Sequence, residues 1–264
     1  MALIQNRIVV KVGTSSLTNE AGNTNLRAFD KLALVLSDIA NLGNEVILVS
    51  SGAIAVGTSK MGLKEKPKSM RMKQAAAAVG QCQNMFLYDK FFGEYGHTIA
   101  QILLNASDIE MEEKKENLTN TFNALLESGV IPVVNENDSV SYTEIESKDR
   151  LFGDNDMLSA VVSVLVQAKR LVIFSDIDGF YEADPRFHPQ AKLIHRIDRI
   201  DETLYSLAGG AGSRRGTGGM RTKLQAADIA TRQGVSVIVT NGKNPDVLYD
   251  IADGKKVGTR FHRG

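Results

Sequence analysis

IVVKVGTS, at residues 8–15, decides the fold, because an apolar run broken by one lysine ends in a glycine turn. A strand with one face in water alternates apolar and polar residues, whereas a near-continuous apolar run is typical of a parallel strand that is buried on both faces. Similar runs recur at 46–49, 99–104, 130–134, 171–174 and 235–239. The sequence therefore predicts a mostly parallel sheet.

Segments with helical spacing lie between most of these strands. They cover 26–42, 69–92, 118–127, 157–167 and 223–233. Strands that alternate with helices form a central sheet with helices on both faces. We predict a three-layer α/β/α sandwich. A chain of 264 residues with 43% hydrophobic content can bury one full core, so we expect residues 1–264 to form a single domain.

Composition and charge limit the partners that we expect. The chain has 31 basic and 31 acidic residues, so no net charge draws it to nucleic acid or to an anionic membrane. Its longest apolar stretch, 158–168, is shorter than the ~20 residues that a membrane span needs, and the N-terminus lacks the order of a signal peptide. The single cysteine, Cys82, cannot form an internal disulfide. We expect a cytoplasmic protein.

Small, polar and glycine residues follow the predicted strands, at the edge where parallel sheets bind ligands. Lys11 is the first candidate, because a strand holds it rigidly and Gly13 lets backbone N–H groups approach a phosphate. The alternative is a lysine that reaches solvent before an ordinary turn. The second candidate is SSGAIA, residues 50–55, where a helix N-terminus could bind an anion next to Gly52. A serine N-cap is the alternative there.

Carboxylates cluster before the predicted helix 157–167. Asp154, Asn155 and Asp156 are helix caps by the usual interpretation, but beside Asp138 they could also hold lysines or a substrate ammonium. Asp138 belongs to the acidic stretch 135–153, which we expect to leave the sheet, for example as a hairpin.

The stretch GGAGSRRGTGGMRTK, residues 209–223, contains six glycines and precedes a helix. So much glycine costs conformational entropy unless the backbone must meet a ligand or move. Lys223, where the loop becomes a helix, could then join enclosed phosphates. A disordered surface loop is the alternative, but it does not explain the basic residues around the glycines.

The stretch LVIFSDIDG, residues 171–179, points to a different enzyme class. It resembles the signature of haloacid-dehalogenase phosphatases, in which the first aspartate, here Asp176, would be the nucleophile and a magnesium ligand. That motif normally opens the phosphatase fold, whereas four predicted strands precede it here. A phosphatase is therefore a minor alternative.

Five motifs together are more specific than any one of them. KVGTS (11–15), SGAIA (51–55), NEND (135–138), FGDND (152–156) and GTGGM (216–220) follow one another as in the glutamate 5-kinases, a group within the amino acid kinase family that this chain resembles. The match spans nearly the whole chain. The resemblance implies the amino acid kinase fold and ATP-dependent phosphorylation of the γ-carboxylate of L-glutamate to L-glutamate 5-phosphate, the first step of proline biosynthesis.

The resemblance also implies roles for single residues. Lys11 and Lys223 are similar to the lysines that contact the transferring phosphoryl group, and Asp156 is similar to the carboxylate that positions them. The implied substrate-binding residues are Ser51, Gly52, Ala53, Asp138, Asp154 and Asn155. The implied nucleotide-binding residues are Lys11, Gly13, Ser175, Asp176, Thr217, Gly218, Gly219, Met220, Arg221, Thr222 and Lys223. Mg²⁺ comes with ATP in this family, so we expect no direct protein ligands for it.

Further expectations follow from the same resemblance. Relatives are inhibited by L-proline and form dimers or tetramers. Because the acyl phosphate product is expected to be labile, a reductase that forms glutamate 5-semialdehyde is a further candidate partner. Many of them continue into a C-terminal PUA domain. Because this sequence ends at Gly264, where the kinase domain of relatives ends, we expect no PUA domain.

The charges of the two substrates predict how the reaction is catalysed. A carboxylate with a pKa of about 4.3 is already an ionised nucleophile at neutral pH and needs no general base. The obstacle is repulsion between this anion and a triphosphate, so lysines, Mg²⁺ and helix N-termini must supply most of the catalysis. Two alternatives stay open. One is an amino acid kinase for acetylglutamate, aspartate, carbamate or UMP, and the other is a non-catalytic amino acid sensor.

Overall fold

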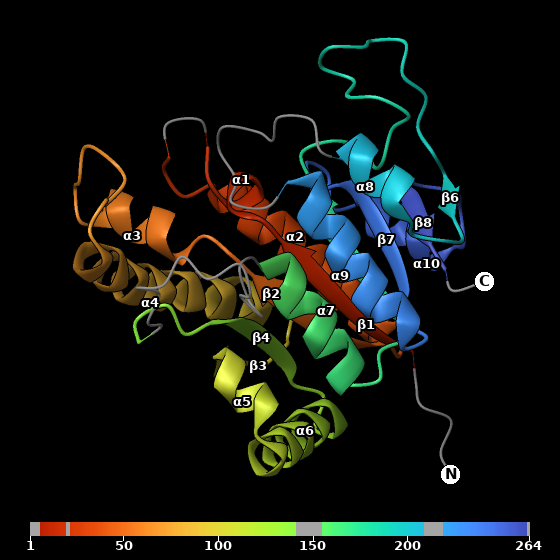
Figure 1. The fold of residues 1–264 in the computed structure, drawn as a ribbon. Coiled ribbons are helices and arrows are strands. Elements are labelled where there is room, and N and C mark those ends of the chain that lie inside the picture. Colours follow the sequence, from red (N-terminus) through yellow and green to blue (C-terminus); the bar gives the residue numbers. More distant parts are fainter. Residues whose placement is uncertain (1–5, 20–21, 141–154, 209–218, 263–264) are drawn as a thin grey trace.

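The computed structural model describes residues 6–19, 22–140, 155–208 and 219–262, which build one eight-stranded sheet (Figure 1). The strand order is β3-β4-β2-β1-β5-β7-β8-β6. The strands are β1 (Arg7–Val12), β2 (Glu45–Ser50), β3 (Ile99–Leu104), β4 (Ile131–Glu136), β5 (Arg170–Ser175), β6 (Arg196–Ile197), β7 (Ser236–Asn241) and β8 (Thr259–Phe261). The six strands from β3 to β7 in this order pair in parallel, which confirms the mostly parallel sheet. Only β8 pairs antiparallel, with β7, among the described strands.

Helices cover both faces of this sheet. On one face lie α2 (Leu26–Asn41), α4 (Met70–Glu94) and α10 (Val247–Ala252), and on the other lie α6 (Glu112–Glu127), α7 (Asn155–Leu165) and α9 (Met220–Arg232) (Figure 1). The shorter helices are α1 (Thr14–Leu17), α3 (Ala53–Lys60), α5 (Ala106–Glu110) and α8 (Glu202–Ala208). Each face has its own buried hydrophobic cluster, so the predicted three-layer sandwich is confirmed. Within the described ranges, no helix is both long and apolar enough to cross a membrane.

The central strand β1 shows how the sequence places its lysine. Ile8, Val10 and Val12 pack into the cluster with α2 and α4, whereas Val9 packs into the cluster with α7 and α9. Successive side chains of a strand point to opposite faces. Lys11 therefore shares the face of Val9 and lies on the side of α7 and α9.

The strand order also fixes where a ligand can bind. β1 lies between β2 and β5, so the chain leaves β1 towards one side of the sheet and later returns on the other. In open α/β sheets, the carboxyl ends of strands at such a reversal form the ligand crevice. The ends of β1, β2 and β5 carry the predicted groups at Lys11, Ser51 and Ser175.

The expectation that residues 135–153 leave the sheet is wrong for the first two of these residues. Asn135 and Glu136 do not leave the sheet, because they extend β4 and pair with Leu103 and Leu104 of β3. The strand ends at Glu136, and residues 141–154 lie outside the described part of the chain.

Candidate active site

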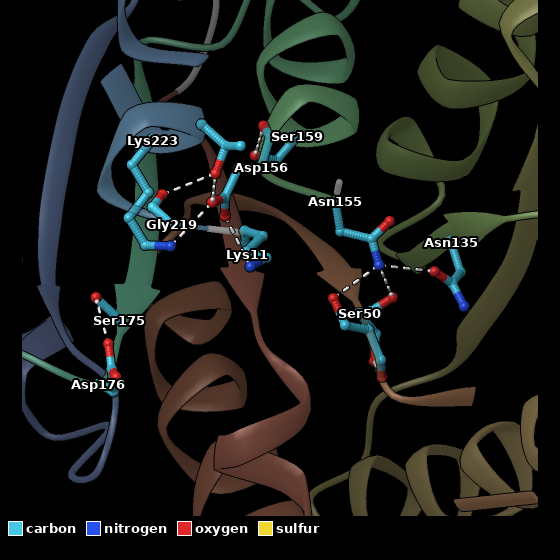
Figure 2. A network of polar contacts seen from close by, with 12 residues as sticks. Lys11, Ser50, Asn135, Asn155, Asp156, Ser159, Ser175, Asp176, Gly219 and Lys223 are labelled. Carbon is cyan, nitrogen blue, oxygen red and sulfur yellow. Dashed lines mark hydrogen bonds and ion pairs between the residues drawn. The ribbon is translucent and has the colours of Figure 1, made fainter. Parts of the chain in front are cut away.

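Two lysines meet one buried carboxylate at the start of α7. Lys11 Nζ lies 2.7 Å from Oδ1 of Asp156, and Lys223 Nζ lies 2.9 Å from Oδ2 (Figure 2). Asp156 is 0% exposed, Lys11 5% and Lys223 6%. The structure thus brings the three predicted catalytic residues into one group, the lysine–aspartate cluster. They come from the end of β1, the first turn of α7 and the first turn of α9.

The charges of this cluster stabilise one another. Burial alone would raise the pKa of Asp156, but the ammonium groups of Lys11 and Lys223 outweigh burial and hold that pKa below its ordinary value. Asp156 is therefore ionised at neutral pH, and its single negative charge lies between two positive ones. The hydroxyl of Thr222 lies 3.2 Å from Oδ2 of Asp156 and 2.8 Å from the carbonyl oxygen of Gly219. Among these three side chains, two positive charges face one negative charge, and such a group can attract an anion.

Asn155, the neighbour of Asp156, belongs to a neutral network. Its Nδ2 lies 2.7 Å from Ser51 Oγ, 3.0 Å from Asn135 Oδ1 and 3.2 Å from the carbonyl oxygen of Ser50 (Figure 2). Asn135 in turn donates from Nδ2 to Gln81 Oε1 at 2.9 Å. We call Gln81, Asn135 and Asn155 the amide relay.

This network leaves two groups that suit an amino acid. Because Ser51 Oγ accepts a hydrogen bond from Asn155, the hydroxyl can donate its own hydrogen elsewhere. Asn155 uses its NH₂ group within the protein, so its Oδ1 is an acceptor. A donor beside an acceptor complements the α-carboxylate and α-ammonium of an amino acid.

The turn after β1 and the start of α3 lie against each other. Gly52 precedes α3 with a φ of 95°, in the left-handed region that favours glycine, and a Cβ there would lie 3.6 Å from Cα of Thr14. A Cβ at Gly13 would lie 3.7 Å from Lys11 Nζ. Two separate predictions, the group around Gly13 and the group Gly52 and Ala53, thus meet beside the lysine–aspartate cluster.

A cleft lies beside Lys223, and neither Lys11 nor Asp156 lines it. It is lined by five of the predicted residues, Ser175, Asp176, Gly219, Met220 and Lys223. The other residues that line the cleft were not predicted from the sequence. These are Ile177, Phe180, Tyr181, Ala183, Asp184, Pro185, Arg186, Leu207 and Ala208. Most of them follow the carboxyl end of β5, and that position is the signal that could have found them.

Other predicted nucleotide residues lie differently. Thr222 contacts Asp156, and the guanidinium of Arg221 lies 5.6 Å from the ring centre of Tyr205, so neither lines the cleft. Thr217 and Gly218, together with the predicted substrate residue Asp154, lie outside the described residues.

Asp138 lies two residues beyond β4 and is partly buried. Burial raises the pKa of this carboxyl above its ordinary value. The described residues offer it no hydrogen bond or ion pair, so the structure does not join Asp138 directly to Asn155 or Ser51. A positively charged ligand group would relieve the cost of its burial.

Comparison with known proteins decides the family. The model of the amino acid kinase family matches residues 6–241. The chain belongs to the amino acid kinase family. It is 55% identical to a glutamate 5-kinase of Clostridium perfringens, over 97% of this chain and 94% of that protein, and 49% identical to one of Enterococcus faecalis, over 98% and 95%. This match to a kinase family excludes the phosphatase alternative for Asp176.

Solved structures of amino acid kinase fold proteins confirm the fold. Carbamate kinase from Giardia lamblia bound to AMP-PNP superimposes with a TM-score of 0.70 at 14% identity, covering 98% of this chain and 99% of that one. UMP kinase from Bacillus anthracis gives 0.65 at 15% identity, covering 97% and 96%. These two kinases are named for different substrates, and at such low sequence identity the superpositions show a shared fold alone.

Proposed function

We propose that this kinase transfers the γ-phosphoryl group of ATP to the side-chain carboxylate of L-glutamate and so forms L-glutamate 5-phosphate, the first step of proline biosynthesis. The observation that carries the proposal is the lysine–aspartate cluster beside the amide relay. The high identity to two glutamate 5-kinases supports the choice of glutamate among the substrates of the family.

The reaction needs charge compensation rather than proton transfer. An oxygen of the glutamate carboxylate forms a bond to the γ-phosphorus, and the bond from that phosphorus to the oxygen of ADP breaks. The carboxylate is ionised at neutral pH, so no base is required. Two unit charges about 4 Å apart interact by about 4 kcal/mol at an effective dielectric of 20. Lys11 and Lys223 can therefore offset the repulsion between the two anions.

Asp156 positions both lysines in this proposal. Its two oxygens hold one ammonium group each, so the charges that meet the phosphoryl group are in place before the substrate arrives. Lys223 also lines the cleft, which makes it the link between nucleotide and cluster. Apolar walls such as Phe180, Leu207 and Met220 suit an adenine base. Mg²⁺ bound to ATP would supply further positive charge to neutralise the phosphates.

The amino acid is held by neutral groups and one carboxylate. Ser51 donates to the α-carboxylate, Asn155 Oδ1 accepts from the α-ammonium, and Asp138 supplies the negative charge that favours this ammonium. Gly52 and Ala53 lie beside the reacting groups, where Gly52 lacks a side chain that would obstruct them. The raised pKa of Asp138 supports this assignment, because a partly buried carboxylate gains from a cationic ligand.

The resemblance extends the proposal beyond the site. The extended proposal includes feedback inhibition by L-proline and assembly into a homo-oligomer. It also includes transfer of the product to a reductase that forms glutamate 5-semialdehyde, and a cytoplasmic location. One continuous sheet, from β3 to β6, supports a single kinase domain.

Hydroxylamine trapping tests the function. Purified protein is incubated with ATP, Mg²⁺, hydroxylamine and either L-glutamate, L-aspartate or N-acetyl-L-glutamate, and the acyl phosphate is measured as its hydroxamate. Release of ADP is followed in parallel with carbamate and UMP. We expect L-glutamate to give the largest kcat/KM. Preference for another acceptor, or amino acid binding without ATP turnover, would refute the assignment.

A further inference from the structure

We propose that Gln81, on α4, is a positioning residue that fixes the orientation of Asn155 for the amino acid substrate. The inference rests on the proposed function, since it concerns the same substrate site. No role for Gln81 was predicted from the sequence, and the groups that connect it to Asn155 are uncharged amides. Its basis is the direction of each hydrogen bond in the amide relay.

The carbonyl oxygen of Ser50 sets this direction. A main-chain carbonyl can only accept a hydrogen bond, so the Asn155 atom that lies 3.2 Å from it must be the NH₂ nitrogen. Asn155 Oδ1 is then the acceptor that remains for a substrate. A flipped amide would place two oxygens together at Ser50 and would offer the substrate ammonium a donor.

The next two links follow from the first. The Asn135 atom that lies 3.0 Å from Asn155 Nδ2 must be the oxygen, so Nδ2 of Asn135 points to Gln81. Asn135 is 2% exposed, and bulk water cannot easily satisfy this amide. Gln81 Oε1, at 2.9 Å, is therefore the acceptor that holds Asn135 in the orientation that Asn155 requires.

Helix α4 is held closely enough to act as a support. A Cβ at Gly80, the residue before Gln81, would lie 1.8 Å from the carbonyl oxygen of Ala53, so the backbones of α3 and α4 are in direct contact. Seven residues after Gln81, on the same face of the helix, the Tyr88 hydroxyl lies 2.8 Å from Ser50 Oγ. Both ends of the relay are thus tied to α4, one through Gln81 and the other through Tyr88 and Ser50.

Removal of the Gln81 acceptor should disturb glutamate more than ATP. In Gln81→Met the side chain keeps its length, but the buried Nδ2 of Asn135 loses its partner. The side-chain amide of Asn135 can then rotate towards another acceptor, and Asn155 loses the oxygen that holds its own amide in place. In Gln81→Glu an acceptor remains at the same place, so the direction of every hydrogen bond is kept.

Steady-state kinetics of the full chain separates these cases. For Gln81→Met we expect the KM for L-glutamate to rise about tenfold, the size expected for one unsatisfied buried amide, while the KM for ATP changes less than about twofold. Gln81→Glu should recover most of the loss. Gln83→Met is the matched control, because Gln83 lies two residues on and its Oε1 accepts from Lys60 instead. We expect it to behave as the unaltered protein.

The outcomes distinguish the inference from the function on which it rests. If the unaltered protein does not phosphorylate glutamate, the proposed function fails and the inference fails with it. If it does, an unchanged glutamate KM in Gln81→Met overturns the positioning role alone. Equal losses for glutamate and ATP, or no recovery in Gln81→Glu, would show a merely structural role and also overturn it.

Discussion

Asn155 and Asp156 are adjacent in the chain, yet they belong to two regions that are held together by different forces. Asp156 is fully buried and carries the charge between Lys11 and Lys223. Asn155 is neutral, and its amide is held by hydroxyl, carbonyl and amide oxygens. Successive residues of an α-helix point about 100° apart, so one helix start can serve both regions.

The difference shows how two tasks of a kinase can be separated. Charge acts over distance and depends little on angle, which suits the stabilisation of a phosphoryl group whose oxygens move during transfer. Hydrogen bonds are directional, which suits the discrimination of one amino acid from another. Changes in the lysine–aspartate cluster should therefore lower kcat, and changes in the amide relay should raise the KM for glutamate.

The largest effect should follow removal of a lysine of the cluster. In Lys11→Met or Lys223→Met the phosphoryl group loses one cation, and we expect kcat to fall by about a thousandfold or more. Initial rates at saturating ATP and glutamate measure it. Lys31→Met is a suitable control, because Lys31 pairs with Asp246 on the surface. A variant that kept a tenth of the original kcat would remove that lysine from the proposed mechanism.

Substitution of the central carboxylate should affect stability as well as rate. Asp156→Asn removes the negative charge that lies between two buried ammonium groups, and we expect a loss of about 3–5 kcal/mol in the free energy of unfolding at pH 7. Because the pKa of Asp156 is held below its ordinary value of 3.8, its stabilising contribution is present above that value and is lost as the pH falls through the lower folded pKa.

Thermal unfolding at several pH values tests this sign. The Tm difference between Asp156→Asn and the unaltered protein should be large at pH 7 and shrink below pH 3.8. Asp198→Asn is the control, since its partner Arg196 is exposed and little change is expected. A difference that grows in acid would contradict the ion-pair account.

A substitution in the amide relay should change the KM for L-glutamate. Asn155→Ala removes the amide that faces three oxygens, and we expect the KM for L-glutamate to rise by about ten- to a hundredfold, as one to two lost hydrogen bonds would require. The KM for ATP should stay within a factor of about two. Substrate saturation curves for both ligands give this ratio. The reverse pattern would place Asn155 on the nucleotide side.

The sequence predicted the charged region better than the neutral one. Lys11 could be placed because it lies at the end of an apolar strand, where parallel sheets bind ligands, and Asp156 because it lies just before a predicted helix. The partner of Asn135 could not be placed in this way. Gln81 lies 54 residues earlier, in a helix that reads as apolar and alanine-rich, and only tertiary packing brings the two amides together.

The fold shows the same limit at its edge. The long buried strands carry enough branched residues to be recognised, whereas β6 has two residues and β8 has three. Such short strands have no measurable period. β8 pairs with β7, and β6 pairs with β8, so both are placed by neighbours that are distant in the sequence. The antiparallel pairing of β8 with β7 was therefore not predicted. This pairing does not alter the site.

Asp138 offers the smallest effect and the sharpest contrast, because stability and affinity should change in opposite directions. Burial raises the pKa of its carboxyl, so the ionised form costs stability at neutral pH, and this cost disappears as the pH falls below the ordinary value of 3.8. In Asp138→Asn we expect the Tm at pH 7 to rise by about 1–4 °C and the KM for glutamate to rise a few-fold. Differential scanning fluorimetry and glutamate saturation measure the two quantities. A lower Tm at pH 7 would mean that Asp138 already has a stabilising partner, and an unchanged KM would mean that the substrate ammonium binds elsewhere.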